Sequence, residues 1–170
     1  MKLHYTCIAL VGTIALSALA QAGEVKLTWQ EPEKYTDIRP SNETRDGFQA
    51  RVIQELGTVF ANLAKKLPDG VTWDVTVTDV DLAGEVRPLM HRATSDIRIV
   101  KDFYWPRVAF SYVVTDAQGR VIGQGKEDLK DMSFMFGGRS ASGRTSFHYE
   151  ERMLRDWFTR QQRDKLLPSR

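Results

Sequence analysis

The chain has 170 residues, of which 42% are hydrophobic, 27% charged and 10% aromatic. This composition is typical of a folded globular domain and excludes disordered, collagen-like and coiled-coil chains. Lys and Arg together number 24, and Asp and Glu 22, so the net charge is +2. So small an excess argues against nonspecific binding to nucleic acid, which needs a clustered surplus of cations. A chain of this length buries roughly 70% of its unfolded surface, so one domain can fold without disulfides.

Residues 1–22 have the layout of a secretory signal peptide. A positive N-terminus precedes an uncharged, mostly apolar run at 7–19, and small residues follow at Ala20 and Ala22. The run is too short to cross a bilayer as a helix, which needs about 20 residues. We therefore expect cleavage after Ala22 or Ala20, export to the periplasm, and a mature single domain over 23–170. A retained membrane anchor is the alternative.

The only cysteine, Cys7, lies at the start of this apolar run. Lipidation requires the apolar stretch to precede the cysteine, so the position argues against a lipoprotein. The mature chain would then contain no thiol, which excludes disulfides, thiol nucleophiles and thiolate metal ligands. No other stretch is long and apolar enough to predict a transmembrane segment.

The rest of the sequence predicts strands and helices in a mixed order. Alternating or β-branched runs predict strands at 24–29, 71–82, 96–101, 108–115 and 120–124. Apolar residues at three- and four-residue steps predict helices at 44–67 and 147–166, the first capped by Thr44 or Asp46. Segment 83–94 is ambiguous. We expect an α+β fold in two layers, with a mostly antiparallel sheet of four to five strands and two helices packed on one face.

Acidic residues follow the apolar face of the strand that begins at residue 71. Asp79 and Asp81 continue the alternation that places valines and a tryptophan on the core side, and Glu85 follows four residues later. Two carboxylates in a core-facing row cannot be buried unpaired, because desolvation of a charge is costly. We expect them to reach solvent, to pair with Arg87, Arg98 or a backbone amide, or to bind a partner or ligand. The spacing does not match a calcium-binding loop, so no metal or cofactor is predicted.

Three consecutive aromatic residues, Phe103, Tyr104 and Trp105, lie between two predicted strands, close to Arg107. Aromatic and Arg side chains are enriched at binding hot spots, so this loop is the second candidate contact surface. The alternative is that the rings fold over the edge of the core.

The last predicted helix is basic. Its cations are Arg152, Arg155, Arg160, Arg163 and Lys165. A solvated face is the default interpretation of such a pattern, and contact with an anionic membrane surface or an acidic partner is the alternative.

Motifs for catalysis are weak. His91 and His148 are the only histidines beyond the predicted signal peptide, so a three-histidine zinc site is excluded. The serines of the loop at 137–143 do not match a nucleophile elbow. Gly123 and Gly125 do not form a phosphate-binding loop and instead indicate a bulge or tight packing in a strand.

Several segments, in this order, resemble a family of bacterial exported proteins catalogued as domain of unknown function 3016. The matching segments are WQEPEKYTDI at 29–38, KLPDG at 66–70, TDVDLAGE at 78–85, DIRIV at 96–100 before Trp105-Pro106, LKDM at 129–132, and the stretch from Tyr149-Glu150 to Trp157-Phe158. The resemblance implies an exported protein of Gram-negative bacteria. It transfers no catalytic residue and no activity.

We therefore expect a non-catalytic periplasmic protein that binds a protein or another component of the cell envelope. One alternative is a small-ligand carrier, which predicts an apolar cavity between sheet and helices. The other is an enzyme that uses Asp79, Asp81 or Glu85 with His91 or His148, which predicts that these groups converge in one cleft. The sequence does not predict the oligomeric state.

Overall fold

The computed structural model describes residues 22–87, 96–136 and 146–170. In chain order the elements are β1 (Glu24–Trp29), η1 (Pro32–Lys34), α1 (Arg45–Ala64), β2 (Thr72–Asp81), β3 (Glu85–Arg87), β4 (Ile97–Ile99), β5 (Arg107–Thr115), β6 (Val121–Lys130) and α2 (His148–Arg163). Every predicted strand and helix is confirmed, and the ambiguous segment contributes β3. The signal peptide prediction up to residue 21, His91 and the 137–143 loop lie outside the described residues.

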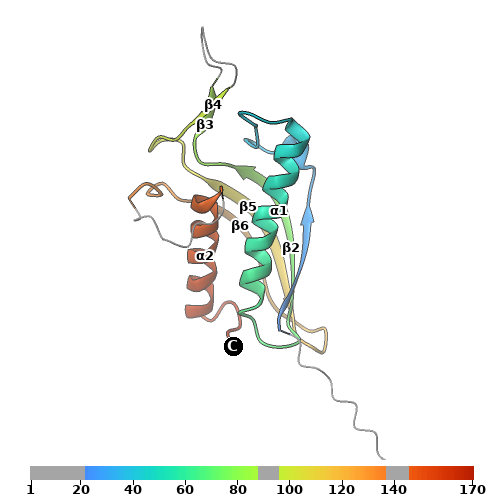
Figure 1. Ribbon diagram of the computed structural model, residues 1–170. Coiled ribbons are helices and arrows are strands. Elements are labelled where there is room, and N and C mark those ends of the chain that lie inside the picture. The colour runs from blue at the N-terminus through green and yellow to red at the C-terminus, as the bar shows by residue number, and fades with distance from the viewer. Residues whose placement is uncertain (1–21, 88–95, 137–145) are drawn as a thin grey trace, which may run out of the picture.

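Four strands form the main sheet, in the order β1-β2-β5-β6, while β3 and β4 form a separate pair. β1 runs parallel to β2, and the other neighbours in the main sheet are antiparallel. The parallel pair is joined through α1, as a parallel connection requires a crossover. The predicted α+β fold is confirmed. β4 pairs with β3 beyond the end of the main sheet (Figure 1).

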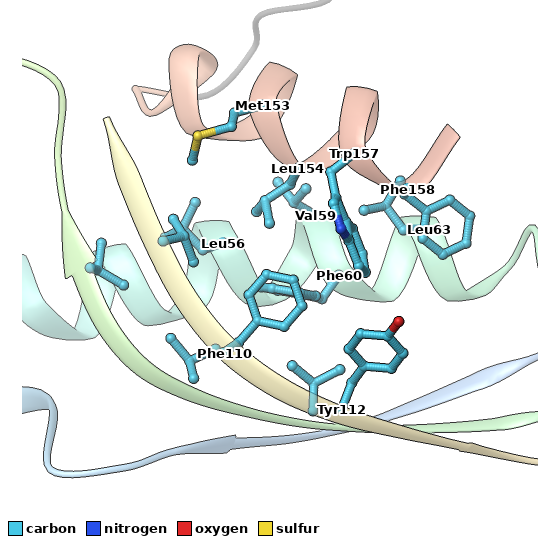
Figure 2. Close-up of a cluster of buried hydrophobic side chains, with 14 of the residues drawn as sticks. Leu56, Val59, Phe60, Leu63, Phe110, Tyr112, Met153, Leu154, Trp157 and Phe158 are labelled. Atoms are coloured by element: carbon cyan, nitrogen blue, oxygen red, sulfur yellow. The ribbon is translucent and has the colours of Figure 1, made fainter. Parts of the chain in front are cut away.

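Both helices lie on one face of the sheet, as predicted (Figures 1 and 2). Thr44 caps α1, because its Oγ1 accepts a hydrogen bond from the Gly47 amide at 3.2 Å. The helix ends at Ala64, earlier than the spacing indicated. Among the described residues, neither helix is sufficiently long and apolar to cross a membrane.

Aromatic side chains fill the space between the two layers (Figure 2). Trp73 of β2 is fully buried and contacts Phe60 of α1, with ring centroids 5.6 Å apart. Trp157 of α2 stacks on Trp73 at 6.1 Å and meets Phe110 of β5 edge-on at 5.0 Å. The two helices and the sheet therefore share one aromatic core.

One of the two glycines in β6 is required by this packing. Gly125 lies opposite Tyr112, and a Cβ atom at Gly125 would come within 2.7 Å of the tyrosine ring. Real Cβ contacts are not this short, so the ring occupies the space that a side chain would need. The interpretation of this glycine as a site of tight packing is confirmed.

Candidate functional site

A β-bulge in β2 decides where the acidic residues point. The register between β2 and β5 shifts between Val77 and Asp79, so Thr78 is an extra residue. Val77 and Val80 are both fully buried, although strict alternation would place them on opposite faces. The expectation that Asp79 and Asp81 continue the core-facing row is therefore wrong. The bulge turns both carboxylates to the face away from the helices.

Asp79 is held in a network of hydrogen bonds. Its carboxylate accepts from the Thr36 amide at 2.8 Å, from the Thr36 hydroxyl at 2.7 Å and from Arg107 Nη1 at 2.9 Å. Arg107 also donates to both carboxylate oxygens of Asp128, and these bonds hold the pKa of Asp128 below its usual value. Asp79 thus joins the loop after β1 to the sheet, and its arginine partner is neither of the two predicted.

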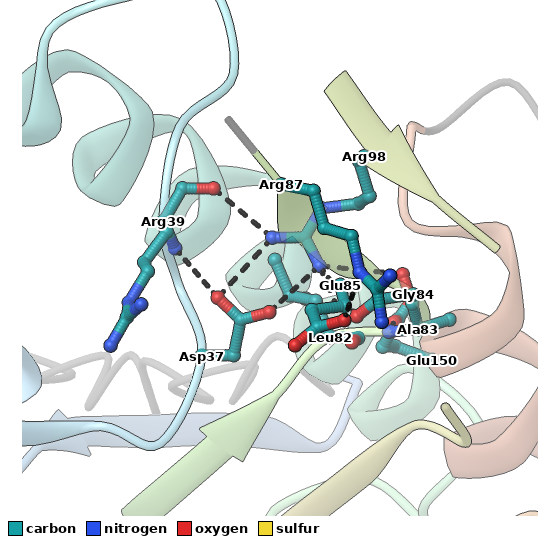
Figure 3. A network of polar contacts seen from close by, with 9 residues as sticks. All are labelled: Asp37, Arg39, Leu82, Ala83, Gly84, Glu85, Arg87, Arg98 and Glu150. Carbon is teal, nitrogen blue, oxygen red and sulfur yellow. Dashed lines mark hydrogen bonds and ion pairs between the residues drawn. The ribbon is translucent and has the colours of Figure 1, made fainter. Parts of the chain in front are cut away.

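Arg98 of β4 clamps the corner between β2 and β3 (Figure 3). Its Nη1 donates to Asp37 Oδ2 at 3.0 Å, to the Gly84 carbonyl at 3.1 Å and to the Ala83 carbonyl at 3.4 Å. Its Nη2 donates to the Arg39 carbonyl at 3.0 Å. The side chains of Arg98 and Asp37 are only 19% and 15% exposed. One guanidinium therefore ties the loop at 37–39, the corner and β4 together.

Glycine is required at this corner. Gly84 has φ +89°, in the left-handed region, and a Cβ atom there would lie 2.8 Å from the Ile99 carbonyl oxygen. The Gly84 amide donates to the Tyr104 carbonyl at 3.0 Å. The glycine thus allows the corner to approach both β4 and the aromatic loop.

A buried carboxyl group that the sequence analysis missed supports the same corner. Glu150, in the first turn of α2, is 2% exposed, and its Oε1 accepts a hydrogen bond from the Ala83 amide at 2.7 Å. Burial raises the pKa of Glu150, and the bond from Ala83 opposes the rise. A signal was available, because Glu150 occupies the first position of the buried stripe 150, 153, 154, 157 and 158.

Next to Arg98 and the corner between β2 and β3 lies a pocket of about 270 Å³, which we call the acidic pocket. It is lined by Asp37, Asp81, Glu85 and Tyr104, together with Thr36, Arg39, Gly84 and Val86. The structure therefore brings Asp81 and Glu85 together, whereas Asp79 is not among the lining residues.

The carboxylates of the pocket differ in their partners. Asp37 pairs with Arg98, and Glu85 pairs with Arg87 at 2.7 Å. Hydrogen bonds with Tyr104 and Arg87 lower the pKa of Glu85. Asp81 makes no ion pair with any residue that the structure describes. Burial, with the nearby charges of Asp37 and Asp79, raises the pKa of Asp81 to about 6, and the charges of Arg107 and Arg98 oppose the rise.

The three aromatic residues of the 103–105 loop differ in exposure, so they do not act together as one contact surface. Tyr104 is half-buried and lines the acidic pocket, where its hydroxyl accepts a hydrogen bond from Arg87 Nη2 at 2.5 Å. Phe103 is 53% exposed and packs against Tyr104, with ring centroids 4.4 Å apart. Trp105 is half-buried and does not line the pocket.

His148 does not line the acidic pocket, although its own cavity borders the same corner at Ala83 and Arg98. It lines a cavity of about 240 Å³ together with Phe48, Phe147 and Glu150, and this cavity shares no lining residue with the acidic pocket. Within the described ranges, no group of three or more His, Cys, Asp or Glu side chains is arranged to hold a metal ion.

Comparison with known proteins gives a family without an assigned activity. The family described as "Protein of unknown function (DUF3016)" matches residues 23–160, which include every strand and most of α2. The comparisons found no matching curated protein and no matching solved structure. Because the match covers most of the sequence, the chain belongs to the DUF3016 family of proteins of unknown function.

Proposed function

We propose that the protein is a non-catalytic, exported protein of the bacterial periplasm that binds a protein or another envelope component through the acidic pocket. The observation that carries the proposal is Asp81. It is half-buried, lines the pocket, and makes no direct ion pair with a described residue, although Arg107 and Arg98 lie near enough to lower its pKa in part. A half-buried carboxylate without a direct ion pair is unfavourable at neutral pH, and a cation supplied by a partner would reduce that penalty.

The size and charge of the pocket indicate what it would hold. A volume of about 270 Å³ is below the usual range for drug-sized ligands, which is about 300–1,000 Å³. It fits one side chain or one small amine. Asp37 is already paired with Arg98, so Asp81 is the carboxylate that can attract a further cation, and we infer that the bound group is an ammonium or guanidinium group of the partner.

Phe103 supports the same surface. An exposed aromatic ring beside a polar pocket is typical of a binding hot spot, because a partner can bury the ring while filling the pocket. The packed aromatic layer between sheet and helices favours this proposal over small-ligand carriage, since Trp73, Trp157 and Phe110 occupy the space that a carrier would leave open.

The test is photo-crosslinking in the producing cells. A photoreactive phenylalanine analogue replaces Phe103, and adducts are recovered from the wild-type chain and from Asp81→Asn. We expect an adduct with the wild-type chain that is lost in Asp81→Asn. Asp74→Asn is the matched control, because Asp74 is an exposed carboxylate on the same strand.

Two outcomes would count against the proposal. An adduct that forms equally well in Asp81→Asn would show that Asp81 is not part of the contact. The absence of any adduct from Phe103, when the analogue at the exposed Met132 gives one, would place the contact surface elsewhere.

A further inference from the structure

We propose that the end of the molecule opposite the acidic pocket binds the surface of a bilayer that contains anionic phospholipid. We call this region the basic end. It comprises the residues after α1 (65–70), the turn between β5 and β6 (116–120), the first residue of β6, and the chain from the last turn of α2 to the C-terminus (160–170). Figure 1 shows the end of α1 and the C-terminus together, far from β3 and β4.

Direct contacts hold these segments together. Gln162 Nε2 donates to the Lys66 carbonyl at 3.4 Å, and Arg170 pairs with Asp69. On the other side, the backbone of β6 approaches the C-terminal segment, since a Cβ atom at Gly123 would lie 3.2 Å from the Leu166 carbonyl oxygen. The basic end is therefore one continuous surface built from three parts of the chain.

The basic end has more cations than local carboxylates can neutralise. The three ranges contain seven Lys and Arg and three Asp, and Glu24 lies nearby at the start of β1. Each of the three aspartates pairs with an arginine, in the pairs Arg170–Asp69, Arg120–Asp116 and Arg163–Asp164.

The cations that remain are exposed. Lys65, Lys66, Lys165 and Arg160 make no ion pair with any described residue. Arg152 and Arg155, nearer the start of α2, differ because they pair with Asp131 and Glu151. The positive charge available to a partner is thus concentrated at the end of the helix rather than along it.

Exposed apolar side chains lie among these cations. Leu166 and Val121 are each 58% exposed. α2 ends with Lys165 in the left-handed region at φ +60°, and the amides of Leu166 and Leu167 both donate to the Gln161 carbonyl. Leu167 is buried by this turn, while Leu166 is left at the surface. Apolar side chains surrounded by lysines are the pattern of a surface that lies on an anionic bilayer.

The apolar side chains of the basic end favour a bilayer over a soluble polyanion. A bilayer can bury Leu166 and Val121, whereas a soluble polyanion would leave both side chains exposed to water.

The experiment measures cosedimentation with vesicles. The protein is purified as the producing cell leaves it, and mass spectrometry defines its N-terminus. Vesicles are either phosphatidylcholine alone or equal parts phosphatidylcholine and phosphatidylglycerol. We expect binding to the anionic vesicles that weakens as salt rises. In the triple variant Lys65→Gln, Lys66→Gln, Lys165→Gln the partition coefficient falls about 100-fold, since each lysine contributes about fivefold. Leu166→Ser weakens binding further without changing its salt dependence.

The matched control removes the same charge from elsewhere. Lys101, Lys126 and Lys130 are exposed and lie outside the basic end, so their joint replacement by Gln should leave the partition coefficient within about threefold of wild type. An equal fall of the partition coefficient in the two triple variants would overturn the proposal, because net charge alone would then explain the binding. Binding to heparin without binding to anionic vesicles would also overturn it and would indicate a soluble polyanion.

Discussion

The two halves of β2 are stabilised in different ways. From Trp73 to Val77 the strand contributes fully buried apolar side chains to a core shared with both helices. Beyond the bulge at Thr78, Asp79 pairs with Arg107, and Arg98 donates to the carbonyl groups of the corner that follows the strand. Apolar burial is non-directional and tolerates small shifts. The polar network depends on the position of each donor, so that end of the molecule can present a carboxylate, Asp81, that has no direct ion pair.

The largest expected loss of stability follows from a substitution in the aromatic core. Trp157→Ala should lower the free energy of unfolding by about 3–5 kcal/mol, because a buried ring that contacts Trp73, Phe110 and Tyr112 is replaced by a cavity. Urea denaturation followed by circular dichroism measures the change. The comparison is Phe103→Ala, which removes an exposed ring and should change stability by less than about 0.5 kcal/mol. If Phe103→Ala lost as much stability as Trp157→Ala, the aromatic loop would belong to the core.

The second largest loss of stability is expected when Arg98 is replaced. Arg98→Ala leaves the Asp37 carboxylate and the corner carbonyls without their donor, so stability should fall by about 2–3 kcal/mol. Arg120→Ala is the matched control, because the Arg120 side chain is 76% exposed and its pair with Asp116 contributes less than about 1 kcal/mol.

A double-mutant cycle with Asp37→Asn isolates the pair. Asp37→Asn should be less destabilising in the Arg98→Ala background than in the wild type. Strict additivity would show that Arg98 acts mainly through the carbonyl groups of the corner.

Periodicity and composition were sufficient to predict the elements and the helical face of the sheet. The 71–82 strand is an example, because its valines and Trp73 alternate over seven residues. What alternation could not predict was the bulge, since one extra residue depends on how β5 pairs with β2 rather than on β2 itself. The wrong orientation of Asp79 and Asp81 follows from that single residue.

The acidic pocket was predictable only in part. Asp81 and Glu85 stood out because carboxylates followed an apolar strand, and Tyr104 because aromatic residues clustered. Asp37 and Arg98 could not be assigned to the same site, since they are 61 positions apart and are brought together by tertiary contacts alone. Glu150 could have been found from its place in the buried stripe of α2.

The smallest expected effect is a gain in stability. The pKa of Asp81 is raised from 3.8 to about 6 in the folded chain, mainly by burial. The folded state therefore binds the proton more tightly than the unfolded state, and this contribution to stability is present below about pH 4 and lost as the pH rises through 6. Asp81→Asn should be more stable than the wild type by about 1 kcal/mol at pH 7, a value reduced for the partial exposure of the group. The free energies of unfolding of the wild type and of Asp81→Asn should become equal at low pH.

Urea denaturation between pH 3.5 and 8 measures this difference, with Asp74→Asn as the control because Asp74 is exposed on the same strand. If Asp81→Asn differed from the wild type by the same free energy of unfolding at every pH, the raised pKa of Asp81 would be contradicted, because the difference would not depend on ionisation. A gain confined to neutral pH, together with loss of the crosslinked adduct, would mean that the group that binds the partner is also the one that destabilises the free protein. Such an opposition between stability and binding is expected where a binding site leaves a carboxylate without a direct ion pair until the partner binds.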